Sequence, residues 1–143
     1  MNNDTIGLLE DCTAGIDMAV ATMDGLLPEI KDHALRQKIQ GSKETHLQLQ
    51  NQTCSLLQQY GGQAKSPSPM ASGMAWLKTN TRMTLKHDDT TAAYLVADGC
   101  DMGVRSLSRS RNRYAGADPQ AIDLAQDLIR AEEQLSAGMR PYL

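Results

Sequence analysis

Three side chains that could bind a metal ion or move a proton fall on or beside the inward faces of predicted helices: His46, Glu132 and Asp17. His46 lies on an apolar helical stripe with Ile39 and Leu49, so its ring is expected inside the fold. Glu132 is enclosed by apolar positions of a later helix, and Asp17 lies beside the stripe of the first helix. Imidazole and carboxylate groups bind iron, manganese and zinc in proteins, and a buried pair of them can also link two helices.

The spacing around these residues departs from a di-iron centre. Such centres take one Glu from each of two helices and a Glu-x-x-His motif from each of the other two. Here Lys43 stands three residues before His46, and Leu135 stands three residues after Glu132. The favoured interpretation is therefore a buried His–Glu hydrogen bond, with no cofactor. A smaller metal site, with Asp17 as third ligand and iron, manganese or zinc as the ion, is the alternative.

Four arginines, Arg105 to Arg113, alternate with serines near the end of a predicted helix. Such alternation occurs in RNA-binding segments, but the chain has a net charge of −3, which argues against nucleic acid as a partner. Basic residues in a last turn also complement the helix dipole. We expect a solvated face that pairs with Asp101 and with acids of the following helix, and an anion or acidic-partner site is the alternative.

Other chemical signals are absent from the sequence. Neither a phosphate-binding loop nor a Gly-x-Ser-x-Gly motif occurs, so no enzyme class is indicated. No apolar run approaches the roughly 20 residues of a membrane span. Cys12, Cys54 and Cys100 are odd in number and widely spaced, which predicts reduced thiols and a reducing compartment. The residues after Met1 do not form a signal peptide, so a cytoplasmic location is expected.

The elements that must position these groups are all helical. The chain is 41% hydrophobic, yet it has no Phe and one Trp, a composition that suits helix-on-helix packing within one domain, residues 1–143. The first helix begins near Asp4 and either ends at Pro28 or continues with a kink to about Lys31. Further helices are expected over residues 33–60, 69–85, 89–114 and 119–139, with stops at glycines and starts at Asp or Pro.

Connection lengths predict the topology. The first two long helices are joined by a few residues, as are the last two, so each pair is an antiparallel hairpin. The connection over residues 61–88 is long and contains the expected short helix. It can return along a bundle roughly 38 Å long, because a helix rises about 1.5 Å per residue. The helices over 33–60 and 89–114 would then run parallel, which is the ferritin-like four-helix bundle arrangement.

In this order of elements the chain resembles the small bacterial ferritin-like four-helix bundles of undefined function. The resemblance rests on Tyr60-Gly61-Gly62, on Trp76 in the connecting helix, and on Asp88-Asp89 before the third long helix. It spans nearly the whole chain. The resemblance implies the fold, and the motifs on which it rests include no catalytic residue.

The sequence therefore favours a non-catalytic ferritin-like bundle that acts by self-association, as a homo-oligomer, or by binding a protein partner. One candidate surface is the glutamine face of residues 33–60, formed by Gln48, Gln52 and Gln59. The other is a narrow stripe of small residues on residues 89–114, which would allow close helix approach: Ala93, Val96, Cys100, Gly103, Leu107 and Ser110. A metal-binding or oxidoreductase ferritin-like protein with a reduced ligand set is the alternative.

Overall fold

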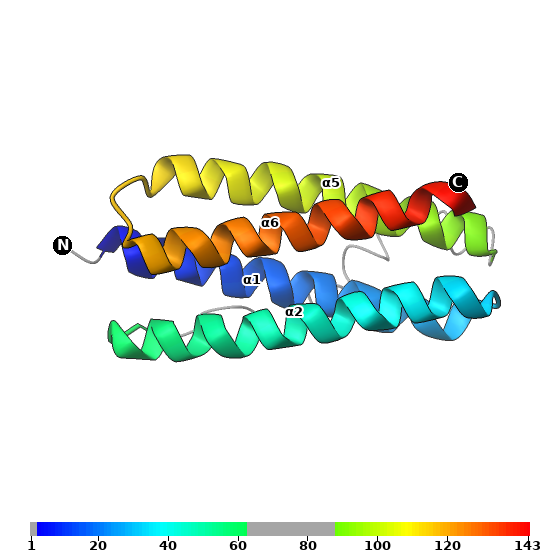
Figure 1. Cartoon of the computed structure of the whole chain (residues 1–143), viewed down its shortest axis with the longest axis horizontal. Coiled ribbons are helices and arrows are strands. Elements are labelled where there is room, and N and C mark those ends of the chain that lie inside the picture. The colour runs from blue at the N-terminus through cyan, green and yellow to red at the C-terminus, as the bar shows by residue number, and fades with distance from the viewer. Residues whose placement is uncertain (1–2, 63–87) are drawn as a thin grey trace.

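The computed structural model describes residues 3–62 and 88–143, and every regular element in these residues is helical. Four long helices lie side by side (Figure 1). They are α1 (Asn3–Leu26), α2 (His33–Gln59), α5 (Asp89–Arg113) and α6 (Pro119–Met139), with single 3-10 turns η1 (Leu27–Glu29) and η2 (Arg140–Tyr142). The prediction of an all-helical chain is confirmed for this part, while the expected connecting helix with Trp76 lies outside it. Within the same residues, no helix has the length and apolar content to cross a membrane.

Local chemistry sets the helix ends where the sequence predicts them. The side chain of Asp32 accepts the backbone N–H of Leu35 at 2.9 Å and caps α2. Asp88 caps α5 in the same way through the N–H of Thr91 at 2.8 Å. Pro28 lies in the 3-10 turn after α1, so the first helix ends there and does not continue to Lys31.

Contacts at the two ends of the bundle establish its topology. The backbone N–H groups of Lys31 and Asp32 both donate to the Asp89 carboxylate at 2.8 Å, which places the starts of α2 and α5 together. At the other end the Tyr60 hydroxyl donates to Asp118, so α2 ends where α6 begins. Helices α2 and α5 therefore run in the same direction at diagonal positions, each packed against α1 and α6 (Figure 1). The predicted pair of antiparallel hairpins with parallel α2 and α5 is confirmed.

The core is divided into two apolar clusters, one toward each end of the bundle. Every helix passes from one cluster to the other at a polar or very small residue: Asp17 in α1, His46 in α2, Gly103 in α5 and Glu132 in α6. The largest fully buried members are Leu8, Leu9, Ile16, Leu57 and Leu128 on one side, and Met23, Leu26, Ile30, Leu35, Ile39, Leu95 and Met139 on the other. Asp17, His46 and Glu132, whose inward positions the sequence predicts, thus form a polar layer across the middle of the fold.

The buried face of α5 is broader than the sequence analysis predicts. In addition to the narrow stripe, Ala92, Leu95 and Ala97 are buried. This half of α5 packs against α6, α1 and the η2 turn, so three directions around the helix are covered. The periodicity of α5 alone indicates one buried face, and it does not show that a third element also covers this helix.

Two glycines within helices should respond oppositely to alanine. A Cβ at Gly41, on the exposed side of α2, meets nothing within 4 Å, so Gly41→Ala should stabilise the fold by about 0.5–1 kcal/mol. A Cβ at Gly7 would lie 2.5 Å from the Tyr114 ring, and Gly7→Ala should destabilise by about 1–3 kcal/mol. Urea unfolding measures both changes. Equal effects of the two substitutions would contradict the close packing of α1 against Tyr114.

Candidate functional site

The polar layer is centred on a contact between α2 and α6. His46 is 0% exposed and Glu132 is 4% exposed, and the imidazole Nε2 is hydrogen-bonded to the carboxylate Oε1. On the other side of the ring, Nδ1 lies 2.7 Å from the backbone carbonyl of Ser42, one helical turn earlier. A carbonyl only accepts hydrogen bonds, so Nδ1 carries a hydrogen and both ring nitrogens are engaged. The predicted His46–Glu132 hydrogen bond is confirmed.

The surroundings of His46 favour its charged form. Burial alone would lower the pKa of His46. The hydrogen bond that His46 donates to Glu132, the negative charge of Glu132 and the Ser42 carbonyl together outweigh burial and raise this pKa above the ordinary histidine value. The contact therefore favours an ion pair between an imidazolium and a carboxylate, whose net charge is zero.

Asp17 lies at the same level but does not join this pair. It is buried, and its Oδ1 accepts a hydrogen bond from the side-chain amide of Gln50 on α2. No hydrogen bond of the described structure connects Asp17 with His46 or Glu132. Asp17 is therefore not a third group beside His46 and Glu132, because its carboxylate lies against Gln50, one turn beyond His46. Ser42 occupies the other side of the His46 ring.

The structure brings together two of the three predicted metal ligands. Among the residues that it describes, no group of three or more His, Cys, Asp or Glu side chains could hold a metal ion. The nitrogen of His46 that would bind a metal, Nε2, is bonded to Glu132, and Nδ1 is bonded to Ser42. A metal here would have to displace the existing contact between the ring and the carboxylate.

The three cysteines are free, as predicted, and differ in exposure. Cys100 is buried and hydrogen-bonded to Glu132, and burial, followed by the negative charge of this carboxylate, raises its pKa far above the ordinary range. Burial and the charge of Asp11 raise the pKa of Cys12 to about 12. Cys54 is only partly buried. Burial of Cys12 and Cys100 therefore keeps both as neutral thiols at physiological pH.

These differences predict a split in thiol reactivity. In the folded chain, Cys54 should react with a disulfide reagent such as DTNB at least tenfold faster than Cys12 and Cys100, which need an opening of the fold. Cys54→Ser should remove the fast phase and leave the slow one. Under denaturing, non-reducing conditions all three thiols should titrate, and a value near one per chain would show that two of them are bridged.

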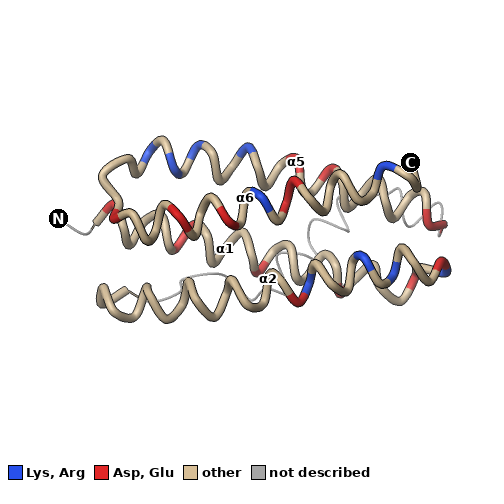
Figure 2. The backbone as a smooth tube through the Cα atoms, viewed as in Figure 1, with Lys and Arg blue, Asp and Glu red and all other residues tan. Residues whose placement is uncertain are grey.

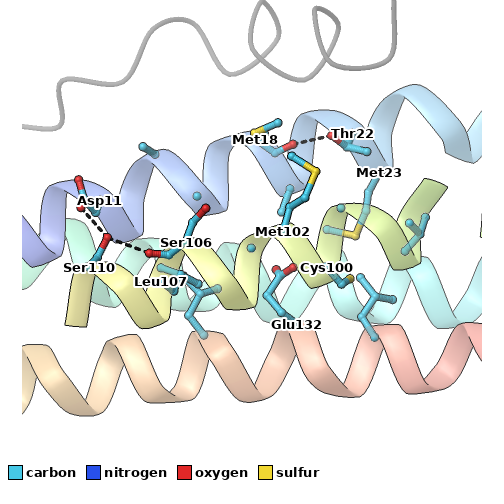
Figure 3. A pocket seen from close by; sticks show the side chains of 18 residues that line it. Asp11, Met18, Thr22, Met23, Cys100, Met102, Ser106, Leu107, Ser110 and Glu132 are labelled. Atoms are coloured by element: carbon cyan, nitrogen blue, oxygen red, sulfur yellow. Dashed lines mark hydrogen bonds between the residues drawn. The ribbon is translucent and has the colours of Figure 1, made fainter. Parts of the chain in front are cut away.

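A cavity of about 340 Å³ lies between α1 and α5, with α6 as its floor (Figure 3). Its walls are mostly small or apolar, and the exposed Ser106 and the 44% exposed Met102 show that it reaches the surface. Residues of α1 that line it are Asp11, Ala14, Gly15, Met18, Ala19, Thr22 and Met23, and α6 contributes Leu128, Glu132 and Leu135. From α5 come Val96, Gly99, Cys100, Met102, Gly103, Ser106, Leu107 and Ser110.

The small-residue stripe of α5 accompanies close packing against α6, where Gly103 lies directly over Glu132, but not against α1. Toward α1 most of that stripe lines the cavity, and α1 presents Ala14, Gly15 and Ala19 to the same cavity. At one end the Ser110 hydroxyl joins the two helices by donating to Asp11 at 2.6 Å. Away from this contact, the small residues of both helices leave the space between α1 and α5 open.

Glu132 connects the polar layer with the cavity. Its Oε1 is bonded to His46, while Oε2 lies over Gly103, where a Cβ would come within 3.1 Å of this oxygen. Figure 3 shows the carboxylate directed from α6 toward α5, beside Cys100. The absence of a side chain at Gly103 thus leaves room for Oε2 at the floor of the cavity.

Figure 2 shows basic residues along the half of α5 that ends at Arg113. Arg105, Arg109 and Arg113 are exposed, as a solvated face requires, and Arg111 donates to the side-chain oxygen of Gln126 on α6. Within the described ranges none of the four forms an ion pair with an acid, so the predicted pairing is wrong. Asp101, the expected partner, accepts from Ser136 at 3.2 Å.

No family model, no curated protein and no solved structure matches this chain. Sequence reasoning found His46 and Glu132 but missed the cavity and Gln50. Glycines within two helices, Gly15 and Gly103, were the available signal, because glycine in a helix interior is unfavourable without a structural reason.

Proposed function

We propose that this chain is a non-catalytic binding protein with the ferritin-like arrangement of helices, and that its partner occupies the cavity between α1 and α5. The observation that carries the proposal is the cavity itself. Its volume of about 340 Å³ falls within the roughly 300–1,000 Å³ of ligand sites, and its walls are apolar with few polar groups. The stripe of small residues on α5, which the sequence offers as a contact surface, lines this cavity.

The groups that could do chemistry support a binding role over catalysis. His46 does not line the cavity, and its hydrogen-bonding groups are engaged by Glu132 and Ser42. Cys100 does line the cavity, but burial and the adjacent carboxylate keep its thiol neutral and thus a poor nucleophile. The parallel direction of α2 and α5 fits a ferritin-like bundle, and three unpaired cysteines fit a cytoplasmic protein.

Filling the cavity tests the proposal. Gly15→Leu places a large side chain in the cavity, since a Cβ at Gly15 meets only Leu107, at 3.9 Å. An apolar compound such as 2-methylnaphthalene should raise the melting temperature of the wild-type chain by several degrees and that of Gly15→Leu much less. Gly41→Leu, which adds the same side chain on open surface, is the matched control and should respond like the wild type. Equal responses of wild type and Gly15→Leu would reject the cavity as the binding site.

The alternative is a metal-binding or oxidoreductase ferritin-like protein, and it rests on the contact between His46 and Glu132. Equilibrium dialysis against zinc, manganese or iron(II) at neutral pH addresses it. One ion per chain, lost in both His46→Leu and Glu132→Leu, would favour this alternative over the binding proposal.

A further inference from the structure

The walls of the cavity suit an apolar ligand of variable shape. Met18, Met23 and Met102 line it, and methionine side chains are unbranched and adaptable. Residues with little or no side chain, among them Gly15 and Gly103, line it as well. Such a surface binds through shape and burial, so recognition of a particular chemical class must come from the polar groups.

The floor of the cavity presents one strong acceptor. His46 engages Oε1 of Glu132, and within residues 3–62 and 88–143 the other donor to this carboxylate is the Cys100 thiol, a weak one. A carboxylate has about four acceptor positions, and buried ones are costly to leave unfilled. Oε2, over the bare backbone of Gly103, can therefore accept a further hydrogen bond from the side of the cavity.

The charges around this oxygen favour a neutral ligand. Glu132 is hydrogen-bonded to His46 on α2, a contact that favours the charged imidazolium and so balances the carboxylate, and burial keeps Cys100 on α5 a neutral thiol. On α1, Asp11 lies at the far end and accepts from Ser110. A cation in the apolar centre would add an uncompensated charge to a neutral pair, and an anion would be repelled by Glu132. A hydroxyl or an uncharged N–H avoids both costs.

We propose that the cavity binds a small, neutral, largely apolar molecule with one hydrogen-bond donor, which Oε2 of Glu132 accepts. This inference rests on the proposed function and specifies its ligand class. Two compounds of the same shape test it: 2-naphthol, which carries a hydroxyl, and 2-methylnaphthalene, which carries a methyl group instead. Their dissociation constants are measured by fluorescence or calorimetric titration of the full chain at neutral pH.

The decisive quantity is the ratio of the two dissociation constants. The dissociation constant of 2-methylnaphthalene divided by that of 2-naphthol should be about tenfold or more higher in the wild type than in the double variant His46→Leu/Glu132→Leu. The reason is that a hydrogen bond to a charged group is among the stronger ones. The double variant removes the acceptor without leaving an unpaired charge. Gly103→Ala, which places a methyl group beside Oε2, should shift the ratio in the same direction and serves if the double variant does not fold.

The outcomes separate this inference from the proposed function. If both compounds bind and their ratio is the same in wild type and variants, the cavity is a binding site but Glu132 does not select the ligand. If neither compound binds the wild type up to its solubility limit, both proposals fail. A ratio that favours 2-naphthol in the wild type and falls in both variants supports the inference.

Discussion

His46→Ala should lower the free energy of unfolding by about 3–5 kcal/mol, the cost of leaving a buried charge without its partner. Removal of the ring leaves the Glu132 carboxylate, 4% exposed, with the weak Cys100 thiol as its remaining described donor. It also opens a void where the ring lies, at 0% exposure, between the two core clusters. Urea unfolding followed by circular dichroism measures the loss.

A double-mutant cycle distinguishes a paired charge from ordinary packing. The combined change His46→Leu with Glu132→Leu should cost much less than the sum of the single changes, because it removes both charges together. Ser42→Ala is the matched control. The substitution keeps the 2.7 Å bond from His46 to the Ser42 carbonyl and removes only the longer 3.4 Å contact between the Ser42 hydroxyl and Nδ1, so it should change stability by only about 0.5 kcal/mol. Additive losses at positions 46 and 132 would show that the two side chains are not coupled.

Raising the pH from about 6.5 to 8.5 should destabilise the wild-type chain, by up to about 1.4 kcal/mol per pH unit while His46 titrates. The folded pKa of His46 is raised above its unfolded value of about 6.5, so the folded state binds the proton more tightly. The stabilisation from this proton is complete below the unfolded pKa and is lost as the pH rises through the folded pKa. Urea midpoints across this range give the slope.

The buried thiols affect a different part of the same curve. Cys12 and Cys100 also have raised folded pKa values, whereas an unfolded thiol ionises near pH 8.5. They should lower stability further above about pH 8.5. The variant His46→Leu/Glu132→Leu should therefore lose the decline between pH 6.5 and 8.5 and keep the one above it. A wild-type stability that is constant or rises from pH 6.5 to 8.5 would contradict the ion pair.

The helices could be predicted from the sequence because their signals are local. The caps at Asp32 and Asp88 act on backbone groups three residues away, and apolar periodicity identifies the buried face of a single helix. At the end of α2, Gly61 adopts a φ of 76°, a conformation that glycine reaches without strain. The end of this helix could therefore also be predicted from the local sequence. Connection lengths then sufficed to predict that α2 and α5 run parallel.

The sequence places His46, Glu132 and Asp17 at one level of the bundle, but it predicts only some of the contacts that they make. A rise of about 1.5 Å per residue places His46, Glu132 and Asp17 at one level once the helix directions are known. Which side chains meet depends on the rotation of each helix about its axis, and this rotation is set by packing against all its neighbours. The ring of His46 is directed at Glu132 on α6, while Asp17 meets Gln50.

By itself the sequence determined the helix boundaries, the inward position of His46 and Glu132, and the direction of every long helix in the described residues. These properties depend on chemistry within a few residues or on the reach of the chain. Only the tertiary structure decided that the space beside Gly15 and Gly103 stays open and that Glu132 presents an oxygen to it. The separation of α1 and α5 results from the side chains of all four helices packing at once, so no single helix pattern contains it.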